Sequence, residues 1–108
     1  MRTADVERLQ SFYVGVLGFS VRQEARAGSV WLDADDVVLM IERAADGERA
    51  VTPGTMDLLA FTMGDDTKER WRERIERSGT RIEDETAYTL YFRDPDDRRI
   101  AVSSYCFA

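Results

Sequence analysis

A helix signature that occurs twice in this chain, 61 residues apart, is the feature that most constrains its fold. Asp5 precedes a stretch with apolar residues at spacings of three and four, and Gly18 follows that stretch. Asp66 and Gly79 flank a second such stretch at the same offset of 61 residues. Aspartate is a favoured helix N-cap and glycine often follows a helix C-terminus. The two stretches are therefore predicted to be the helices of an internally duplicated protein.

Short runs rich in β-branched and aromatic residues follow each predicted helix, as is typical of strands. They span residues 19–24, 29–33 and 37–42 in the first copy, and 81–85, 88–93 and 99–104 in the second. Residues 55–63 form a further run before the second helix, whereas only residues 1–4 precede the first. The pattern predicts an α+β fold of two βαβββ modules, in which the first strand of module 1 is truncated.

The length of 108 residues is that of one domain. Module 1 is predicted at about 1–43, a linker at 44–54 and module 2 at about 55–108, because Asp46-Gly47 and Pro53-Gly54 are turn dipeptides. Either the first strand is a stub or the natural chain begins upstream of Met1. A missing strand exposes a neighbour's hydrogen-bonding groups, which other parts of the chain or a partner would cover. We therefore expect a homodimer.

Composition narrows the partners and the compartment. The formal charge of −6 disfavours nucleic acid and favours a neutral or cationic ligand. No apolar run approaches membrane-spanning length, and the first residues do not resemble a signal peptide. The single cysteine, Cys106, fits a reducing compartment and is expected to be a small packing residue. A cytoplasmic protein without membrane or nucleic-acid partners is predicted.

Two motifs carry a resemblance to a known family. Residues 5–19 follow the pattern D-x-E-R-x-x-x-F-Y-x-x-x-L-G-F, and residues 91–100 resemble Y-F-x-D-P-D-G-x-x-I, with Asp97 in place of glycine. In both respects the chain resembles the vicinal oxygen chelate superfamily, which includes glyoxalase I, extradiol dioxygenases, fosfomycin-resistance proteins and metal-free bleomycin-resistance proteins. The resemblance covers nearly the whole chain and implies a curved mixed sheet.

The resemblance also indicates where a metal would bind. In the metalloenzymes of this superfamily, histidine and carboxylate ligands project from the leading and last strands of each repeat into the hollow of the sheet. The matching positions here are Leu58, Ala101 and about Leu39, and the fourth falls before Met1. The chain contains no histidine. We therefore predict no metal, no cofactor and no catalytic residue.

Two nearby carboxylates were considered as substitute ligands. Alternation along a strand places Asp57 opposite Leu58, and Glu42 opposite Leu39. Both are expected to be solvated or paired with a basic residue.

An apolar hollow is suited to the flat part of a small molecule. The same alternation adds Val37 and Ile41 to the face of Leu39, and predicts Met40 and Met63 on the helix side. Resemblance to fosfomycin-resistance proteins implies that Thr89 and Tyr91 face inward, and the repeat places Trp31 opposite Tyr91. Trp31 and Tyr91 could instead fill the core or a dimer interface. The predicted ligand-binding residues are Trp31, Leu39, Leu58, Thr89, Tyr91, Ala101 and Ser103.

Three functions remain open at this point. The favoured one is a metal-free small-molecule-binding protein resembling bleomycin-resistance proteins, with a partly aromatic or cationic ligand in a cleft. The second is a metal-dependent lyase or oxidoreductase of the glyoxalase or dioxygenase type. The third is a non-catalytic assembly module.

Overall fold

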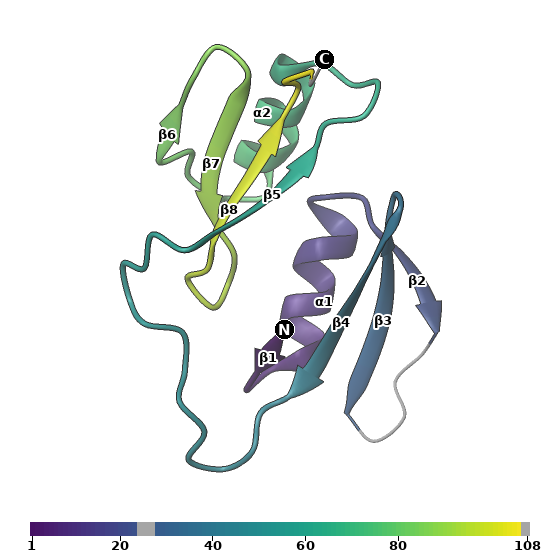
Figure 1. Ribbon diagram of the computed structural model, residues 1–108, viewed down its shortest axis with the longest axis vertical. Helices are drawn as coiled ribbons and strands as arrows, with labels where there is room; N and C mark the ends of the chain where they lie inside the picture. Colours follow the sequence, from purple (N-terminus) through teal and green to yellow (C-terminus); the bar gives the residue numbers. More distant parts are fainter. Residues whose placement is uncertain (24–27, 107–108) are drawn as a thin grey trace. The chain divides into compact units, whose positions relative to one another are not determined.

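The computed structural model describes residues 1–23 and 28–106. These residues form two compact units, Met1–Ala50 and Val51–Ala108, and each unit holds one helix and one four-stranded sheet (Figure 1). The first contains β1 (Arg2–Thr3), α1 (Val6–Gly15), β2 (Ser20–Gln23), β3 (Ser29–Ala34) and β4 (Val37–Arg43). The second contains β5 (Leu58–Thr62), α2 (Lys68–Arg77), β6 (Asp84–Glu85), β7 (Thr89–Arg93) and β8 (Arg99–Ser103). The predicted α+β fold of two βαβββ modules is confirmed.

The two sheets have the same topology. Their strand orders are β1-β4-β3-β2 and β5-β8-β7-β6, and in each sheet the leading strand runs parallel to the last strand while the other pairs are antiparallel. Both sheets are therefore mixed, as predicted. The leading strand of the first unit has only two residues, which pair with Glu42 and Arg43 of β4. The predicted truncation of this strand is confirmed.

Strand boundaries differ from the sequence prediction at several ends. β6 covers only Asp84–Glu85 instead of residues 81–85, and β5 begins at Leu58 instead of residue 55. Residue 24, at the end of the predicted second strand, lies outside the described residues. The polar character of residues 81–83 gives this edge little apolar surface to bury, which explains the shorter strand.

The cap of the first helix was predicted correctly and that of the second was not. The Asp5 side chain accepts a hydrogen bond from the Arg8 backbone nitrogen at 3.0 Å. In α2 the N-cap is Thr67, whose hydroxyl accepts from the Arg70 nitrogen at 3.2 Å, while the Asp66 carboxylate accepts from the Thr67 nitrogen. Both residue types cap helices, so sequence alone did not decide between two adjacent candidates.

The end of α1 also differs from the prediction. The helix ends at Gly15 with Val16 as its C-cap, three residues before Gly18. Gly18 has a φ of +77°, a conformation that glycine adopts without strain, and the next residue, Phe19, donates a backbone hydrogen bond to the Tyr13 carbonyl at 3.1 Å. Gly18 therefore turns the chain toward β2 and does not itself end the helix.

Each sheet buries one face, which we call its helix face, against the helix of its own unit. In the second unit Leu90, Phe92 and Ile100 are fully buried, as is Ile75 of α2. Burial of such a side chain contributes about 1.5–3 kcal/mol each. The opposite surface of each sheet, called its outer face below, carries the polar and partly exposed residues. The outer faces are thus the surfaces available to a ligand.

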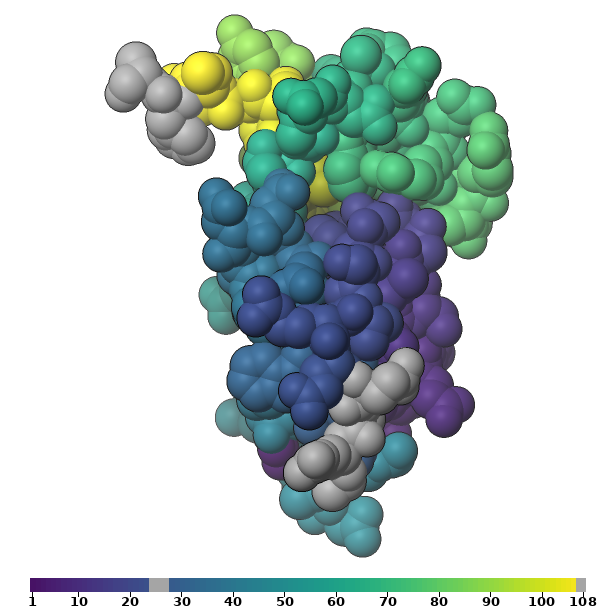
Figure 2. All heavy atoms as spheres, turned by 90° about the vertical axis from the view of Figure 1, so that its right-hand side faces the viewer, coloured from purple at the N-terminus to yellow at the C-terminus, as the bar shows by residue number. Residues whose placement is uncertain are grey.

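Two expectations about single residues have different outcomes. Met63 is buried as predicted, and its carbonyl accepts a hydrogen bond from the Trp71 indole nitrogen at 3.1 Å. Cys106, expected to pack inside, is exposed. It belongs to the segment after β8, which lies at the surface in Figure 2. Neither described helix has the length and apolar character needed to cross a membrane.

Candidate functional site

The outer face of the second sheet brings most of the predicted ligand-binding residues together. Residues paired across neighbouring strands point to the same face of a sheet. The pairing of β5 with β8 and of β7 with β8 therefore arranges the outer face in three rows. They are Thr62, Ser103 and Thr89; Ala60, Ala101 and Tyr91; and Leu58, Arg99 and Arg93. The predicted shared face of Leu58, Thr89, Tyr91, Ala101 and Ser103 is confirmed.

The first row offers hydroxyl groups. The Thr89 and Ser103 hydroxyl oxygens lie 2.8 Å apart in a hydrogen bond, and the Ser103 oxygen also accepts from the Tyr105 backbone nitrogen at 3.1 Å. Both hydroxyl-bearing residues are half-buried. A hydroxyl has one donor and two acceptor sites, so this pair retains capacity for a ligand hydrogen bond.

The central row is small and apolar except for one aromatic ring. Ala60 and Ala101 are in register, and Ala101 is fully buried. Tyr91 lies beside Ala101 on β7 and is half-buried. Methyl groups cannot coordinate a cation, and within the described residues no three histidine, cysteine or acidic side chains gather closely enough to hold one. The residues of this face do not fit a metal centre.

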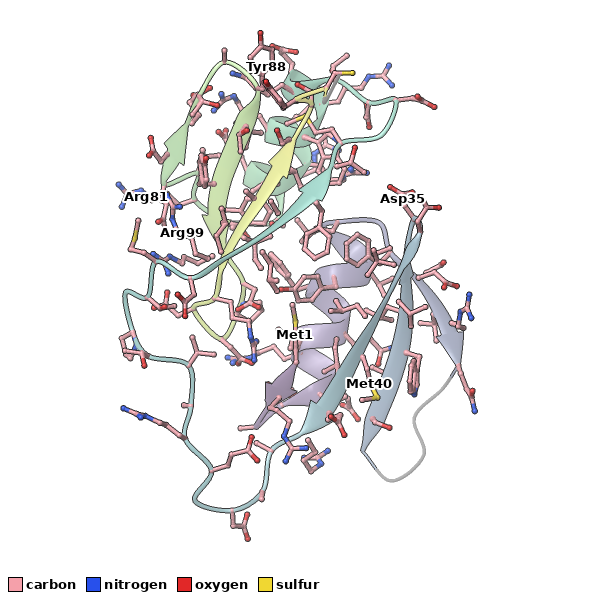
Figure 3. All side chains as sticks on the ribbon, viewed as in Figure 1. Met1, Asp35, Met40, Arg81, Tyr88 and Arg99 are labelled. Carbon is pink, nitrogen blue, oxygen red and sulfur yellow. The ribbon has the colours of Figure 1, made fainter. Side chains whose placement is uncertain are left out.

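The third row is charged and joined to Tyr91. The Arg99 guanidinium lies 4.3 Å from the centroid of the Tyr91 ring, and its Nε donates to Glu83 at 3.2 Å. Arg93 donates to the same carboxylate at 2.6 Å. Hydrogen bonding from Arg93 is the main cause that holds the pKa of the Glu83 carboxyl below its ordinary value, against the effect of burial. Glu83 thus neutralises part of the charge of two arginines. Figure 3 labels Arg99 near one end of this sheet and Tyr88 near the other.

The predicted ion-pair partners of these arginines were wrong. Arg93 and Arg99 were expected to pair with the aspartates of the turn after β7. Arg98 instead binds Asp94 at 3.2 Å and Asp96 at 3.1 Å. Arg98 precedes β8 in the same turn as these aspartates, whereas Arg93 and Arg99 project from the strands toward Glu83. Glu83 lies before the short strand β6, and no sequence pattern indicated its place beside the outer face.

The first sheet contributes Trp31 but not Leu39 to an outer face. Trp31 is 42 % exposed and pairs with Met40, whereas Leu39 pairs with the fully buried Leu32. Leu39 is therefore on the helix face, together with the buried Ile41, and Met40 has the place predicted for Leu39. Both face assignments were wrong.

The physical reason is the composition of β4. Residues 37–41 are all apolar, so no alternation with polar residues marks which side faces the core. The helical repeat did contain the answer, because the offset of 61 residues makes Met40 the counterpart of Ala101. The exposure of Trp31 in this chain also argues against its proposed role as a core residue. Trp31 and Tyr91 belong to different units.

Comparison with known proteins identifies the family of the fold. The family model of the Glyoxalase/Bleomycin resistance protein/Dioxygenase superfamily matches residues 1–102. No curated protein matches the sequence.

Several solved structures share the fold. The chain is similar to the fosfomycin resistance protein FosX from Mesorhizobium loti, with 19 % identity, a TM-score of 0.78, and coverage of 98 % of this chain and 87 % of that one. It is similar to FosX from Listeria monocytogenes, an E126Q mutant in complex with Mn(II) and 1S,2S-dihydroxypropylphosphonic acid, with 13 % identity, a TM-score of 0.79, and coverage of 99 % and 86 %. It is also similar to lactoylglutathione lyase from Agrobacterium tumefaciens, with 17 % identity, a TM-score of 0.73, and coverage of 95 % and 87 %.

Proposed function

The chain belongs to the glyoxalase/bleomycin resistance protein/dioxygenase superfamily, and from that membership we propose that it binds a small, partly aromatic or cationic molecule without a metal. The binding surface is the outer face of the second sheet, with Trp31 of the first sheet as a further aromatic contact. The proposed role is sequestration or ligand-dependent regulation, since either needs only affinity. Cys106, the only cysteine, is consistent with a cytoplasmic setting.

The observation that carries the proposal is the central row of the outer face. The leading and last strands of the module meet there at Ala60 and Ala101, two residues without any ligating atom. An apolar floor between a hydroxyl row and a charged row suits a molecule with an apolar body and polar ends. The formal charge of −6 further favours a neutral or cationic molecule over an anion.

A metal-dependent lyase or oxidoreductase receives no comparable support. Such an activity needs at least three protein ligands for its cation. The outer face offers alanine, leucine and tyrosine in the central positions, and the arginines beside them repel a cation. No catalytic step through a metal is derived for this chain.

Assembly is favoured by one specific observation, and we propose it as a second property. β5 pairs only with β8 in the described part of the chain, and its side chains Leu58 and Leu59 are 41 % and 45 % exposed. An apolar strand at a sheet edge is prone to pair with another strand. A homodimer that covers β5 removes both the apolar exposure and the unpaired backbone groups.

Native mass spectrometry of freshly purified protein, with metal analysis of the same sample, tests the proposal. A metal-free protein that carries an organic adduct supports it and gives the mass of the ligand. A stoichiometric metal contradicts it and returns the chain to the metalloenzymes of the family. The Ala101→Glu variant, which restores the residue usual in the family, is the matched comparison for the metal analysis.

A further inference from the structure

A pocket of about 370 Å³ lies beside the charged row of the outer face and has no part in the function described so far. It is formed within the second unit, between the segment 51–57 and the starts of β5 and β8. Its apolar lining includes Val51, Leu58 and Leu59, and its charged lining is Asp57, Arg98 and Arg99. Ligand pockets have volumes of roughly 300–1,000 Å³, so this one suits a small molecule or the head of a larger one.

The segment that closes the pocket is held in place by hydrogen bonds. Arg93 donates from Nη1 to the Thr55 carbonyl at 2.6 Å, and the Gly54 backbone nitrogen donates to the Asp97 carboxylate at 3.1 Å. Thr55 in turn accepts at its hydroxyl from the Asp57 nitrogen at 3.2 Å. These contacts tie the segment to β7 and to the turn that follows it. The pocket is thus a built feature of the unit.

Asp57 brings a carboxylate without a partner to this pocket. Its side chain makes no hydrogen bond or ion pair with any residue in the described ranges 1–23 and 28–106. The sequence analysis expected Asp57 to be solvated or paired, and it is exposed. An exposed carboxylate beside apolar side chains is suited to a ligand ammonium group, because the ammonium donates hydrogen bonds and the methylene groups next to it bury apolar area.

Arg99 brings the opposite charge, and part of its guanidinium is available. Its side chain is only 11 % exposed, and Nε is engaged with Glu83. Among the described residues Nη1 and Nη2 make no hydrogen bond, and the nearest recorded carboxylate oxygen is that of Asp84, 4.0 Å from Nη2. Arg98, in contrast, is occupied by Asp94 and Asp96. Arg99 therefore has a pair of donors suited to a carboxylate.

Asp57 and Arg99 line the same pocket and form no ion pair with each other. We propose that the pocket binds the zwitterionic head of an amino-acid-like ligand, with the ligand ammonium on Asp57 and the ligand carboxylate on Arg99. A molecule that carries both charges matches both residues, whereas a simple cation meets Arg99 and a simple anion meets Asp57. The proposal rests on the proposed binding function and names the chemistry of its ligand, since Arg99 also lies against Tyr91 on the outer face.

Three matched probes test this proposal by calorimetric titration of the full chain. L-Phenylalanine carries both charges, phenethylamine lacks the carboxylate, and 3-phenylpropionate lacks the ammonium. We expect L-phenylalanine to bind at least about tenfold more tightly than either analogue, since loss of a charged hydrogen bond costs about tenfold or more in Kd. Equal affinity for all three probes overturns the zwitterion and leaves the proposed binding function standing. No binding of any probe, together with no adduct in native mass spectrometry, overturns both.

Variants assign the two contacts. Asp57→Asn is expected to weaken L-phenylalanine and phenethylamine about tenfold and to leave 3-phenylpropionate unchanged or improved. Arg99→Gln is expected to weaken L-phenylalanine and 3-phenylpropionate but not phenethylamine. Asp65→Asn, an exposed aspartate outside the pocket, is the control and should change none of the affinities. Thermal melting of each variant separates loss of binding from loss of the fold, and equal effects of Asp57→Asn and Asp65→Asn contradict the proposal.

Discussion

The guanidinium of Arg99 lies over the ring of Tyr91, 4.3 Å from its centroid, and joins the aromatic and charged parts of the outer face. A cation over an aromatic face contributes about 0.5–1 kcal/mol at exposed sites and more where water is excluded. The contact covers part of the Tyr91 ring, so a ligand meets the arginine and the rest of the tyrosine together. Tyr91 was predicted as one aromatic wall of the cleft, and Arg99 modifies that wall.

Trp31→Ala is expected to weaken ligand binding and to leave the fold intact. Trp31 is 42 % exposed, so its removal should lower the free energy of unfolding by less than about 1 kcal/mol. Leu32→Ala, the neighbouring residue on the helix face, should lower it by about 2–5 kcal/mol, because that side chain is fully buried. Urea unfolding and ligand titration of both variants check the contrast. Unfolding of Trp31→Ala would show that this side chain is part of the core.

Thr67→Ala is expected to destabilise the protein through the second helix. The Thr67 hydroxyl satisfies the Arg70 backbone nitrogen, and loss of an N-cap costs about 0.5–2 kcal/mol. Asp66→Ala should cost less, since the Asp66 carboxylate accepts only from the adjacent Thr67 nitrogen at 3.0 Å and lies 4.0 Å from Arg70. Thermal unfolding of the two variants decides which residue is the cap, and a larger loss from Asp66→Ala would assign the cap to the aspartate.

Stability should fall with decreasing pH in a range set partly by Glu85. Hydrogen bonds from Arg72 at 2.6 Å and from Lys68 at 2.9 Å lower the pKa of the Glu85 carboxyl from 4.5 to about 2. A lowered pKa in the folded state stabilises the protein above pH 4.5, and this contribution is lost as the pH falls from 4.5 toward about 2.

The Glu85→Gln variant tests the origin of that loss. It should be less stable than the wild type at neutral pH, and the difference should shrink at about pH 3. Asp36→Asn, which removes an exposed carboxylate on the β3–β4 turn, is the control and should keep the pH dependence of the wild type. Urea unfolding at both pH values gives the comparison. A difference between Glu85→Gln and wild type that is constant with pH would exclude the ion pairs as its cause.

Sedimentation should show a dimer that depends on β5. Leu59→Lys places a charge on an edge strand, where lysine opposes pairing with another strand. We expect this variant to shift toward monomer while keeping the circular dichroism of the wild type. Val37→Lys, at a residue that is 58 % exposed on β4, is the control. A monomeric wild-type protein would leave the proposed dimer without support.

Chelators should leave the melting temperature unchanged. The central row of the outer face is built from Ala60, Ala101 and Tyr91, so removal of divalent cations has no folded-state ligand to destabilise. Reconstitution with nickel, zinc, manganese or iron should likewise yield no stoichiometric metal. A chelator-dependent fall in melting temperature would contradict the metal-free proposal directly.

The sequence by itself determined the duplication and most of the second outer face. The 61-residue offset predicted two modules because two caps and two glycines at equal spacing need equal helices between them. In β7 and β8 the alternation of Thr89, Tyr91 and Ser103 with fully buried neighbours was regular enough to fix the faces. The absence of histidine is a fact of composition.

Tertiary structure alone decided the points at which local patterns were ambiguous. The face of Leu39 and Met40 depends on which side of a wholly apolar strand meets α1, and only packing chooses between them. The positions of Glu83 beside Arg99, and of Asp57 across the pocket from it, join segments far apart in the chain. Local propensity and periodicity act over a few residues, whereas ion pairs and pockets form between segments whose distance in space the fold sets. For that reason the sequence predicted the modules, and the structure was needed to identify the charged end of the site.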